Sequence, residues 1–529
     1  MAVSAVIHNR SGRHVHRVHR VHRVHRTATL STIHRTRDLH LVPGKGHSRR
    51  VWGNTRKREG LWIPHRRVPG LEPSQAVPNG AAANAWNGKR RRTPQSKEIG
   101  VMPVTRRQFL GTSAAAVLVA GTMGKGTVFG ANERVRVGVA GLNSRGGSHL
   151  EGFGKCDGSE VVAICDVDKR VLEARAKWLA DNTGKRPKTF VDLREMIADP
   201  EVDAVSYATP NHWHALGTVW ACQAGKHVYV EKPVSHDYNE GLAVIEAAKA
   251  NNVIVQHGTQ SRSDHNWVRA IERIHAGVIG EIYMARALCY KNRDSIGFKP
   301  DEAPPEWLDW TLWQGPAQDR PFNTNYVHYN WHWFWAYGNG DIGNQGVHQM
   351  DIAIWGMNKG LPNKVFSMGG RYAYEDQGET PNTQVATLKY PDGTMTVFEV
   401  RGRATNAEGD QKVGNLFYGS GGYAVGTKLY DTEGKEIPDE AVEARPEWGT
   451  GDHFQNFVNA VRNHDANAVH GNPAEAHTGC AHIHLSNIAY RLKTSLDFEP
   501  AAQRFVGNDE ANALLTRDYR EGFEVPQPA

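Results

Sequence analysis

The chain has 529 residues, of which 39% are hydrophobic and 22% charged, a composition that suits a globular protein of two or more domains. The net charge of +7 is uneven, because residues 1–101 hold 21 Lys and Arg against 4 Asp and Glu, a balance of +17 that leaves −10 for the remainder. The folded body is therefore acidic, which excludes a basic surface for nucleic acid, and its five widely spaced cysteines indicate neither a disulfide framework nor a metal site.

Residues 1–101 have the composition of a disordered segment. Val-His-Arg occurs four times over residues 15–26, and the stretch that follows is rich in Arg, Pro and Gly without an apolar period. A nucleic-acid-binding or metal-binding arm is one alternative. A start of translation at Met102 is another, because it places the next motif at the beginning of the chain.

Residues 102–131 resemble a twin-arginine export signal. The motif Thr105-Arg106-Arg107-Gln108-Phe109-Leu110 precedes an apolar run from Gly111 to Gly121. This run is shorter than the roughly 20 residues that span a bilayer, so we expect a cleaved signal, a periplasmic location and no stable membrane anchor.

Strands alternate with helices between residues 132 and 255. We expect strands over 135–139, 160–166, near 190, 202–208 and 227–230, and helices through 149–153 and over 171–182, 193–198 and 215–224. This alternation predicts an α/β fold, a doubly wound parallel sheet of the Rossmann type, whose ligands bind at the carboxyl ends of the strands.

The loop after the first strand fits the phosphate-binding template Gly-x-Gly-x-x-Gly with one departure. Gly141, Asn143 and Gly146 occupy its three glycine positions, and Asn tolerates a left-handed backbone better than most residues. An ordinary strand-to-helix turn is the alternative. Asp166 ends the second strand 20 residues after Gly146, where a carboxylate binds the ribose hydroxyls and repels a 2′-phosphate, so we expect NAD rather than NADP. The expected cofactor-binding residues are Gly141, Asn143, Ser144, Arg145, Gly146, Asp166, Thr209, Pro210, Asn211, His214, Glu231 and Lys232.

Three motifs in order carry a family resemblance. They are Thr209-Pro210-Asn211-His212-Trp213-His214, Glu231-Lys232-Pro233 and Gly346-Val347-His348-Gln349-Met350-Asp351. Over residues 133–500 the chain resembles the glucose–fructose oxidoreductase and inositol dehydrogenase family (Gfo/Idh/MocA). The resemblance implies an NAD(P)-binding domain over 132–255, an α+β domain with a large, mostly antiparallel sheet over 256–505, and a C-terminal tail over 506–529. It also implies catalysis by Lys232 and His348 and a homo-oligomer that assembles through the open face of the large sheet.

The chemistry of alcohol oxidation agrees with these two residues. The ammonium of Lys232 can hold the alcohol oxygen, and the imidazole of His348 can take its proton. Family members often have Asp four residues before this histidine, where this chain has Asn344, whose amide can orient a hydroxyl but cannot accept a proton. Asp341 and Asp351 are nearby alternatives for that task, although Asp351 could instead tether its helix.

Aromatic side chains crowd residues 307–335. Trp307, Trp310 and Trp313 lie three apart, which is typical of core packing. The run over 325–333 mixes stacking faces with hydrogen-bonding groups, as a carbohydrate pocket requires. The residues expected to contact the substrate are Tyr329, Trp331, His332 and Asp351.

The second half of the chain shows strand-like alternation. We expect strands over 364–369, 384–390, 394–400 and 416–418, with a hairpin turn at Pro391-Asp392-Gly393. Helices over 453–463 and 474–492 are expected to close this domain.

These features predict an NAD-dependent oxidoreductase that acts on a sugar or polyol hydroxyl. Little free NAD exists outside the cytoplasm, so an enzyme exported in its folded state is expected to retain its cofactor. A redox-neutral, NAD-dependent glycoside hydrolase is one alternative. A non-catalytic sugar-binding or cofactor-binding protein is the other, because Asn143 and Asn344 depart from the family pattern.

Overall fold

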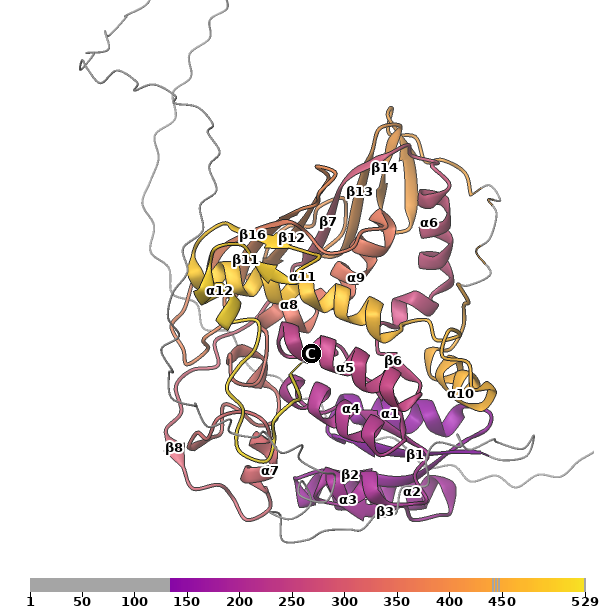
Figure 1. Ribbon diagram of the computed structural model, residues 1–529, viewed down its shortest axis with the longest axis vertical. Coiled ribbons are helices and arrows are strands. Elements are labelled where there is room, and N and C mark those ends of the chain that lie inside the picture. The colour runs from indigo at the N-terminus through magenta and orange to yellow at the C-terminus, as the bar shows by residue number, and fades with distance from the viewer. Residues whose placement is uncertain (1–133, 440–441, 443–444, 446–447, 528–529) are drawn as a thin grey trace, which may run out of the picture. The chain divides into compact units, whose positions relative to one another are not determined.

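The computed structural model describes residues 134–527, apart from 440–441, 443–444 and 446–447. The basic segment expected over 1–101 and the export signal expected over 102–131 therefore lie outside the described residues. Figure 1 shows the described part as two sheets with helices packed on them. In these ranges no helix is both long and apolar enough to cross a membrane, and the five cysteines are free and buried.

The first sheet has six parallel strands in the order β3-β2-β1-β4-β5-β6, which confirms the predicted doubly wound fold. Its elements are β1 (Val135–Ala140), α1 (Arg145–Lys155), β2 (Ser159–Cys165), α2 (Lys169–Thr183), β3 (Lys188–Phe190), α3 (Leu193–Ala198), β4 (Ala204–Tyr207), α4 (His214–Gln223), β5 (His227–Val230), α5 (Tyr238–Asn251) and β6 (Val255–His257). The strand order reverses between β1 and β4, and the crevice at such a reversal is where these sheets bind ligands.

The two faces of this sheet bury different helices. Val135, Val137 and Val139 of β1 pack with α1 and α2, whereas the alternate residue Gly138 faces α3. A Cβ at Gly138 would lie 3.0 Å from Sδ of Met196, so glycine allows α3 to approach the sheet closely. Helices α4 and α5 extend this second layer.

Helix α10 (His453–Asn463) also packs on the first sheet, although the sequence predicts that it closes the second domain. The ring of Phe454 stacks on Tyr229 of β5 with centroids 4.8 Å apart, and Phe457 is buried in the same apolar cluster. The helix was assigned to the wrong domain because its amphipathic pattern does not specify which surface it covers.

Residues 506–527, expected as a tail, return to the nucleotide-binding domain through α12 (Asp509–Ala513) and the segment after it. Phe523 packs edge-on against Trp213 with ring centroids 5.8 Å apart. Arg517 donates to the buried carboxylate of Glu240 at 2.8 Å.

The second sheet has nine strands in the order β15-β14-β13-β7-β12-β11-β10-β16-β17. Only the pair β7 and β12 is parallel, so the mostly antiparallel sheet predicted from the sequence is confirmed. Its strands are β7 (Ile282–Cys289), β10 (Lys364–Gly370), β11 (Thr383–Lys389), β12 (Met395–Arg401), β13 (Val413–Gly419), β14 (Gly422–Val425), β15 (Lys428–Asp431), β16 (Leu496–Glu499) and β17 (Arg504–Phe505).

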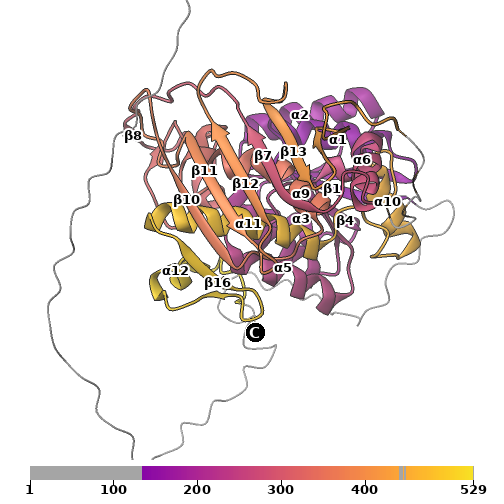
Figure 2. The same cartoon turned by 90° about the horizontal axis from the view of Figure 1, so that it is seen from above.

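One face of the second sheet is covered and the other is open. Helices α6 (His265–His275), α9 (Gly346–Met357) and α11 (Pro473–Leu492) pack on the covered face. Figure 2 looks onto the opposite face, where Phe366, Met368 and Val385 are exposed.

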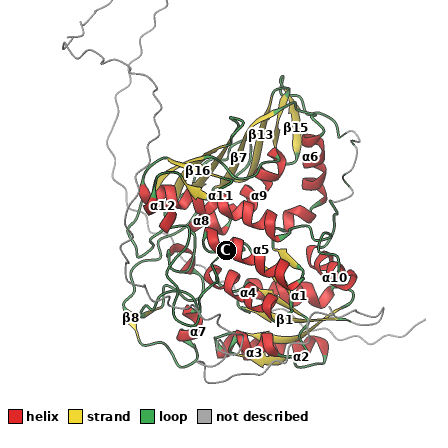
Figure 3. Cartoon of the chain, viewed as in Figure 1, coloured by secondary structure: helices red, strands yellow, loops and turns green. Residues whose placement is uncertain are grey.

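A segment with little regular structure connects β7 to α9 within the second domain (green in Figure 3). It contains β8 (Asp301–Glu302), α7 (Trp310–Gln314), β9 (Phe322–Asn323) and α8 (Gly340–Asn344). The rings of Trp310 and Trp313 stack with centroids 4.9 Å apart and both side chains are buried, which confirms the predicted core packing for these two.

Candidate active site

A cavity of about 400 Å³ lies at the carboxyl edge of the first sheet, between β1 and the second domain. It brings together most of the residues predicted from the three motifs and from the aromatic run. Those that line it are Gly141, Asn143, Ser144, Arg145, Asp166, Thr209, Pro210, Asn211, His214, Glu231, Lys232, Tyr329, Trp331, His332, Asn344 and His348.

The loop between β1 and α1 has the backbone that a dinucleotide cradle requires. Gly141 has a φ of +78°, and a Cβ there would lie 2.6 Å from the backbone nitrogen of Thr209. Gly146 does not line the cavity, but a Cβ there would lie 1.9 Å from the Gly141 carbonyl oxygen. The non-glycine residue of the loop that has a positive φ is Ser144, with a φ of 52°, rather than Asn143.

Two unsatisfied features of this loop fit a pyrophosphate. Ser144 precedes α1 and makes no side-chain capping hydrogen bond, so the positive end of the helix dipole is left for an anion. Thr209 Oγ1 is buried beside the loop and has no hydrogen-bond partner within the described structure. The residues present therefore fit the phosphates of NAD.

Asp166 lies where the ribose of such a cofactor is expected. Its carboxylate accepts hydrogen bonds from the backbone nitrogens of Leu142 at 2.7 Å and Asp168 at 2.9 Å. Burial raises the pKa of Asp166, and the two hydrogen bonds oppose that effect. Since a carboxylate accepts about four hydrogen bonds, capacity for ribose hydroxyls remains.

The buried carboxylate of Glu231 connects the segments around the cavity. Its Oε1 accepts from Arg145 at 2.7 Å, from Gln260 at 3.1 Å and contacts His149 Nε2 at 3.1 Å. Burial alone would raise the pKa of Glu231, but the hydrogen bond from His149 and the charge of Arg145 hold it well below its usual range. Glu231 therefore serves as an anchor for the cofactor loop.

Lys232 projects from the turn after β5 toward the second domain. Its Nζ donates to the backbone oxygen of Asn344 at 2.7 Å and to the amide Oδ1 of the same residue at 3.2 Å. Burial lowers the pKa of Lys232, with further contributions from the charges of Arg145 and Lys291, while Glu231 opposes them. The structure thus brings Lys232 and Asn344 together.

His348 lies in the first turn of α9 and lines the same cavity. Burial lowers the pKa of His348 to about 3, and the nearby charge of Lys232 adds to this effect. The imidazole is therefore neutral at pH 7, the state in which it can accept a proton.

The aromatic run supplies one wall of the cavity. The rings of Trp331 and His332 stack with centroids 3.6 Å apart, and Tyr329 is half exposed at the surface of the wall. Burial lowers the pKa of His332 to about 3, so this ring is also neutral. The wall offers flat apolar faces next to hydrogen-bonding groups.

The two aspartates considered as bases are both paired with arginine. Asp351 does not line the cavity, and its carboxylate is held by buried Arg262 at 2.9 Å, so its expected contact with substrate is not supported. Asp341 is buried and accepts from Arg293 at 2.6 Å. Both carboxylates are held by arginines and neither lines the cavity, whereas His348 does.

His214 is a link between loops rather than a residue with a free ring nitrogen. Its Nδ1 lies 2.6 Å from the Pro233 carbonyl oxygen and its Nε2 lies 2.8 Å from the Thr209 carbonyl oxygen. It therefore ties the loop after β4 to the turn that carries Lys232.

Sequence reasoning missed several residues of the cavity. Gln260 follows β6, and its position after a strand of the parallel sheet was a usable signal, although β6 is only three residues long. His328 and Gln345 also line the cavity, and each is adjacent to a predicted residue. Trp313 both packs in the core and reaches the cavity.

Two family models match the chain. The model described as oxidoreductase family, NAD-binding Rossmann fold, matches residues 135–259. The model described as oxidoreductase family, C-terminal alpha/beta domain, matches residues 293–525. Together they cover the first sheet, all of the second sheet except β7, and every residue that lines the cavity except Gln260.

Curated relatives match part of the chain. A protein named Glycosyl hydrolase family 109 protein 1 from Shewanella sp. (strain MR-4) is 27% identical over 194 residues, 35% of this chain. An alpha-N-acetylgalactosaminidase from Shewanella oneidensis is 30% identical over 196 residues. In both cases the match spans 42% of the relative's own length.

Solved structures share the fold over most of the chain. The WlbA dehydrogenase from Bordetella pertussis, in complex with NADH and UDP-GlcNAcA, is 22% identical with a TM-score of 0.51, covering 69% of this chain and 99% of that one. A scyllo-inositol dehydrogenase from Lactobacillus casei, with NAD(H) and scyllo-inositol, is 20% identical with a TM-score of 0.50, over 69% and 99%.

We expect the protein to lose stability as the pH falls below about 6.5. Burial lowers the pKa of His212, His332 and His348 to about 3, whereas imidazoles of the unfolded chain titrate near 6.5. Between these values the unfolded state binds more protons, so the free energy of unfolding decreases as pH decreases, by about 1.4 kcal/mol per pH unit for each such histidine. Urea unfolding at a series of pH values measures this slope.

The variant His348→Gln removes one of these groups and should reduce the slope by about one proton, or ~1.4 kcal/mol per pH unit. A slope equal to that of the unmodified protein would show that His348 is not held neutral.

Proposed function

Because the chain belongs to the Gfo/Idh/MocA oxidoreductase family, we propose that it oxidises a hydroxyl of a sugar or polyol by hydride transfer to NAD. The observation that carries this proposal is that Lys232, Asn344 and His348 line the same cavity as the loop that fits the phosphates of NAD. The residues match the needs of alcohol oxidation, since one donates a hydrogen bond to oxygen and another is a neutral base.

Each side chain has a defined task in this proposal. The bound nicotinamide supplies the hydride acceptor. Lys232 donates a hydrogen bond to the reacting hydroxyl and stabilises the negative charge that develops on its oxygen. His348 takes the hydroxyl proton on a ring nitrogen and, because its pKa is low, gives it up readily. Asn344 orients the ammonium of Lys232.

A carbohydrate substrate is supported by the wall of Tyr329, Trp331 and His332, which combines stacking faces with polar groups. The two dehydrogenase structures contain UDP-GlcNAcA and scyllo-inositol, respectively, as bound compounds. Cavity and comparisons together favour a polyhydroxylated substrate.

We further propose that the enzyme is exported through the twin-arginine pathway to the periplasm with its cofactor bound. The motif at Arg106-Arg107 supports this step, and export of a folded protein would carry NAD along.

We also propose that chains associate through the open face of the large sheet, where Phe366 and Met368 are exposed. A monomeric mass in light scattering would count against that association.

A redox-neutral glycoside hydrolase is the second candidate. The observation in its favour is the name Glycosyl hydrolase family 109 carried by curated relatives. In this chemistry a ring hydroxyl is oxidised transiently, which acidifies the neighbouring C–H and allows the leaving group to be eliminated. Water then adds and the oxidation is reversed, so Lys232 and His348 keep the same tasks.

We expect protein purified without added nucleotide to show the absorbance of bound NAD(H). It should then be offered free sugars and aryl glycosides in turn. NADH that accumulates with a free sugar or polyol supports the oxidoreductase, whereas release of the aryl group without net NADH supports the hydrolase. Failure to bind NAD at any concentration would contradict both.

The variant Lys232→Met should lower turnover by about 100-fold or more, because one donor to a developing oxyanion contributes that much. Its dissociation constant for NAD should stay within about twofold of the original, since the phosphate and ribose contacts are untouched. Stopped-flow absorbance and calorimetric titration measure the two quantities.

The variant Asp166→Ala provides the opposite comparison: NAD binding should weaken, and an unchanged affinity would refute its ribose contact.

A further inference from the structure

The substrate side of the cavity has no available carboxylate. Among the described residues that line the cavity, only Asp166 and Glu231 are acidic. Asp166 lies at the end of β2, on the cofactor side, and Glu231 is paired with Arg145 at 2.7 Å. Beyond the lining, buried Asp341 is neutralised by Arg293.

Two ammonium groups approach the same turn between α8 and α9. Lys232 Nζ donates to Asn344, and Lys291 Nζ donates to Oε1 of Gln345 at 2.5 Å. Within the described residues neither lysine forms an ion pair, and both partners are neutral amides or carbonyls. Asn344 and Gln345 are consecutive and both line the cavity, so the two positive charges lie beside one short stretch of its wall, although Lys291 is not itself a lining residue.

The backbone around Lys291 is fixed on both sides. Before it, the Tyr290 nitrogen donates to the Lys412 carbonyl oxygen at 2.6 Å. After it, the Arg293 nitrogen donates to the Gly402 carbonyl oxygen at 2.8 Å. Gln345 is oriented in turn by its amide nitrogen, which donates to Gln349 Oε1 at 3.3 Å. The ammonium of Lys291 is therefore preorganised.

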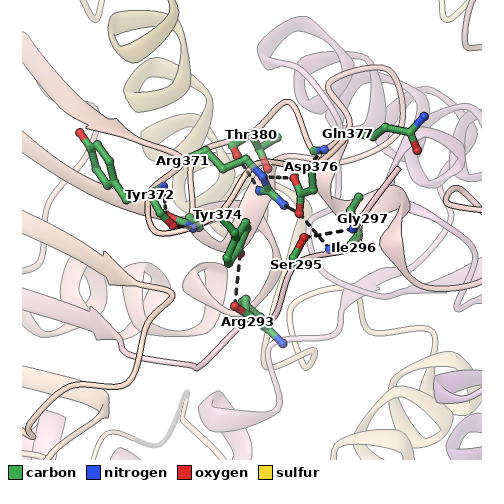
Figure 4. A network of polar contacts seen from close by, with 12 residues as sticks. Arg293, Ser295, Ile296, Gly297, Arg371, Tyr372, Tyr374, Asp376, Gln377 and Thr380 are labelled. Carbon is green, nitrogen blue, oxygen red and sulfur yellow. Dashed lines mark hydrogen bonds and ion pairs between the residues drawn. The ribbon is translucent and has the colours of Figure 1, made fainter. Parts of the chain in front are cut away.

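A buried ion pair holds the continuation of this segment, as Figure 4 shows. The carboxylate of Asp376 accepts from Arg371 at 2.5 Å and from the Ile296 backbone nitrogen at 2.8 Å. The hydroxyl of Tyr374 donates to the Arg293 carbonyl oxygen at 3.2 Å. These contacts restrain the loop that follows Lys291 against the loop over 371–380.

Uncompensated positive charge at the edge of a cavity is costly unless a ligand brings the counter-charge. The N-terminal end of α9, which starts at Gly346 without a side-chain cap, adds to the positive potential next to the cavity. In the proposed function Lys232 donates a hydrogen bond to the reacting hydroxyl oxygen. Lys291 is therefore the ammonium group that remains to bind a second group of the same substrate molecule.

We propose that the substrate is a sugar that carries an anionic group, a carboxylate or a phosphate, and that this group binds the ammonium of Lys291. This proposal rests on the proposed function, because it concerns the substrate of the same cavity. It names a specificity-determining residue outside the three sequence motifs.

The test compares the binding of matched sugars to the full chain loaded with NADH. Glucose, galactose and mannose are each titrated by calorimetry beside the corresponding hexuronate and hexose phosphate. At least one charged sugar should bind about tenfold or more tightly than its neutral parent, and the uronate and phosphate arms identify which anion is used. Neutral parents that bind as well as every charged form would overturn the proposal, as would no binding of any charged sugar.

Variants assign the preference to Lys291. We define the margin as the dissociation constant of the neutral sugar divided by that of the charged sugar. In Lys291→Met this margin should fall to about one, whereas Lys291→Arg should keep most of it. The control Lys177→Met, an exposed lysine of α2 paired with Asp181, should leave the margin unchanged. The variant Asn344→Asp places a carboxylate beside Lys232 and should also reduce the margin. A margin that survives in Lys291→Met would overturn the proposal.

The outcomes separate this inference from the proposed function. Oxidation of neutral sugars without preference for charged ones would sink the inference alone. Tight binding of a charged sugar with no reduction of bound NAD on any sugar would sink the proposed function and leave the binding role of Lys291 in place.

Discussion

The contact of Glu231 with Arg145, His149 and Gln260 is the interaction on which the cavity depends. A carboxylate buried at the end of β5 is costly by itself, and its partners come from α1 and from the segment after β6. Ionisation of Glu231 is maintained because these partners outweigh the effect of burial on its pKa. The cofactor loop and the turn that carries Lys232 are thereby held in one arrangement.

Pairing between acids and arginines also determines which charged groups around the cavity are left to bind a substrate. Three acids near the site are matched to an arginine: Glu231 to Arg145, Asp341 to Arg293 and Asp351 to Arg262. The side chains of Lys232 and Lys291 donate to neutral amides and carbonyls, and the pKa of His348 is lowered to about 3, so its imidazole is uncharged at pH 7. A neutral base next to uncompensated ammonium groups suits the removal of a proton and a hydride from an alcohol, and it favours a substrate that brings negative charge.

Much of the fold could be predicted from the sequence, because the alternating strands and helices of the first domain are local patterns and the carboxyl ends of parallel strands share one edge. Strand β7 could not, because Arg286 interrupts its apolar pattern and its partners β12 and β13 lie far along the chain. Motif positions predicted Lys232, Asn344 and His348. The spacing of residues in a motif does not specify the direction of each side chain, so Asp351 was expected in the cavity but contacts Arg262 instead. Gln260 and Lys291 belong to no motif, and only the folded chain brings Gln260 into the cavity lining and Lys291 against Gln345, which lines the cavity.

The variant Glu231→Gln tests the central claim most directly, because it keeps the shape of the side chain and removes the charge that binds Arg145. Calorimetry should show NAD affinity reduced by about tenfold or more, which corresponds to about 1.4 kcal/mol, with turnover reduced in parallel. The matched change Glu160→Gln, at a surface pair with Lys185, should alter neither quantity. Unchanged NAD affinity and unchanged turnover in Glu231→Gln would contradict the account.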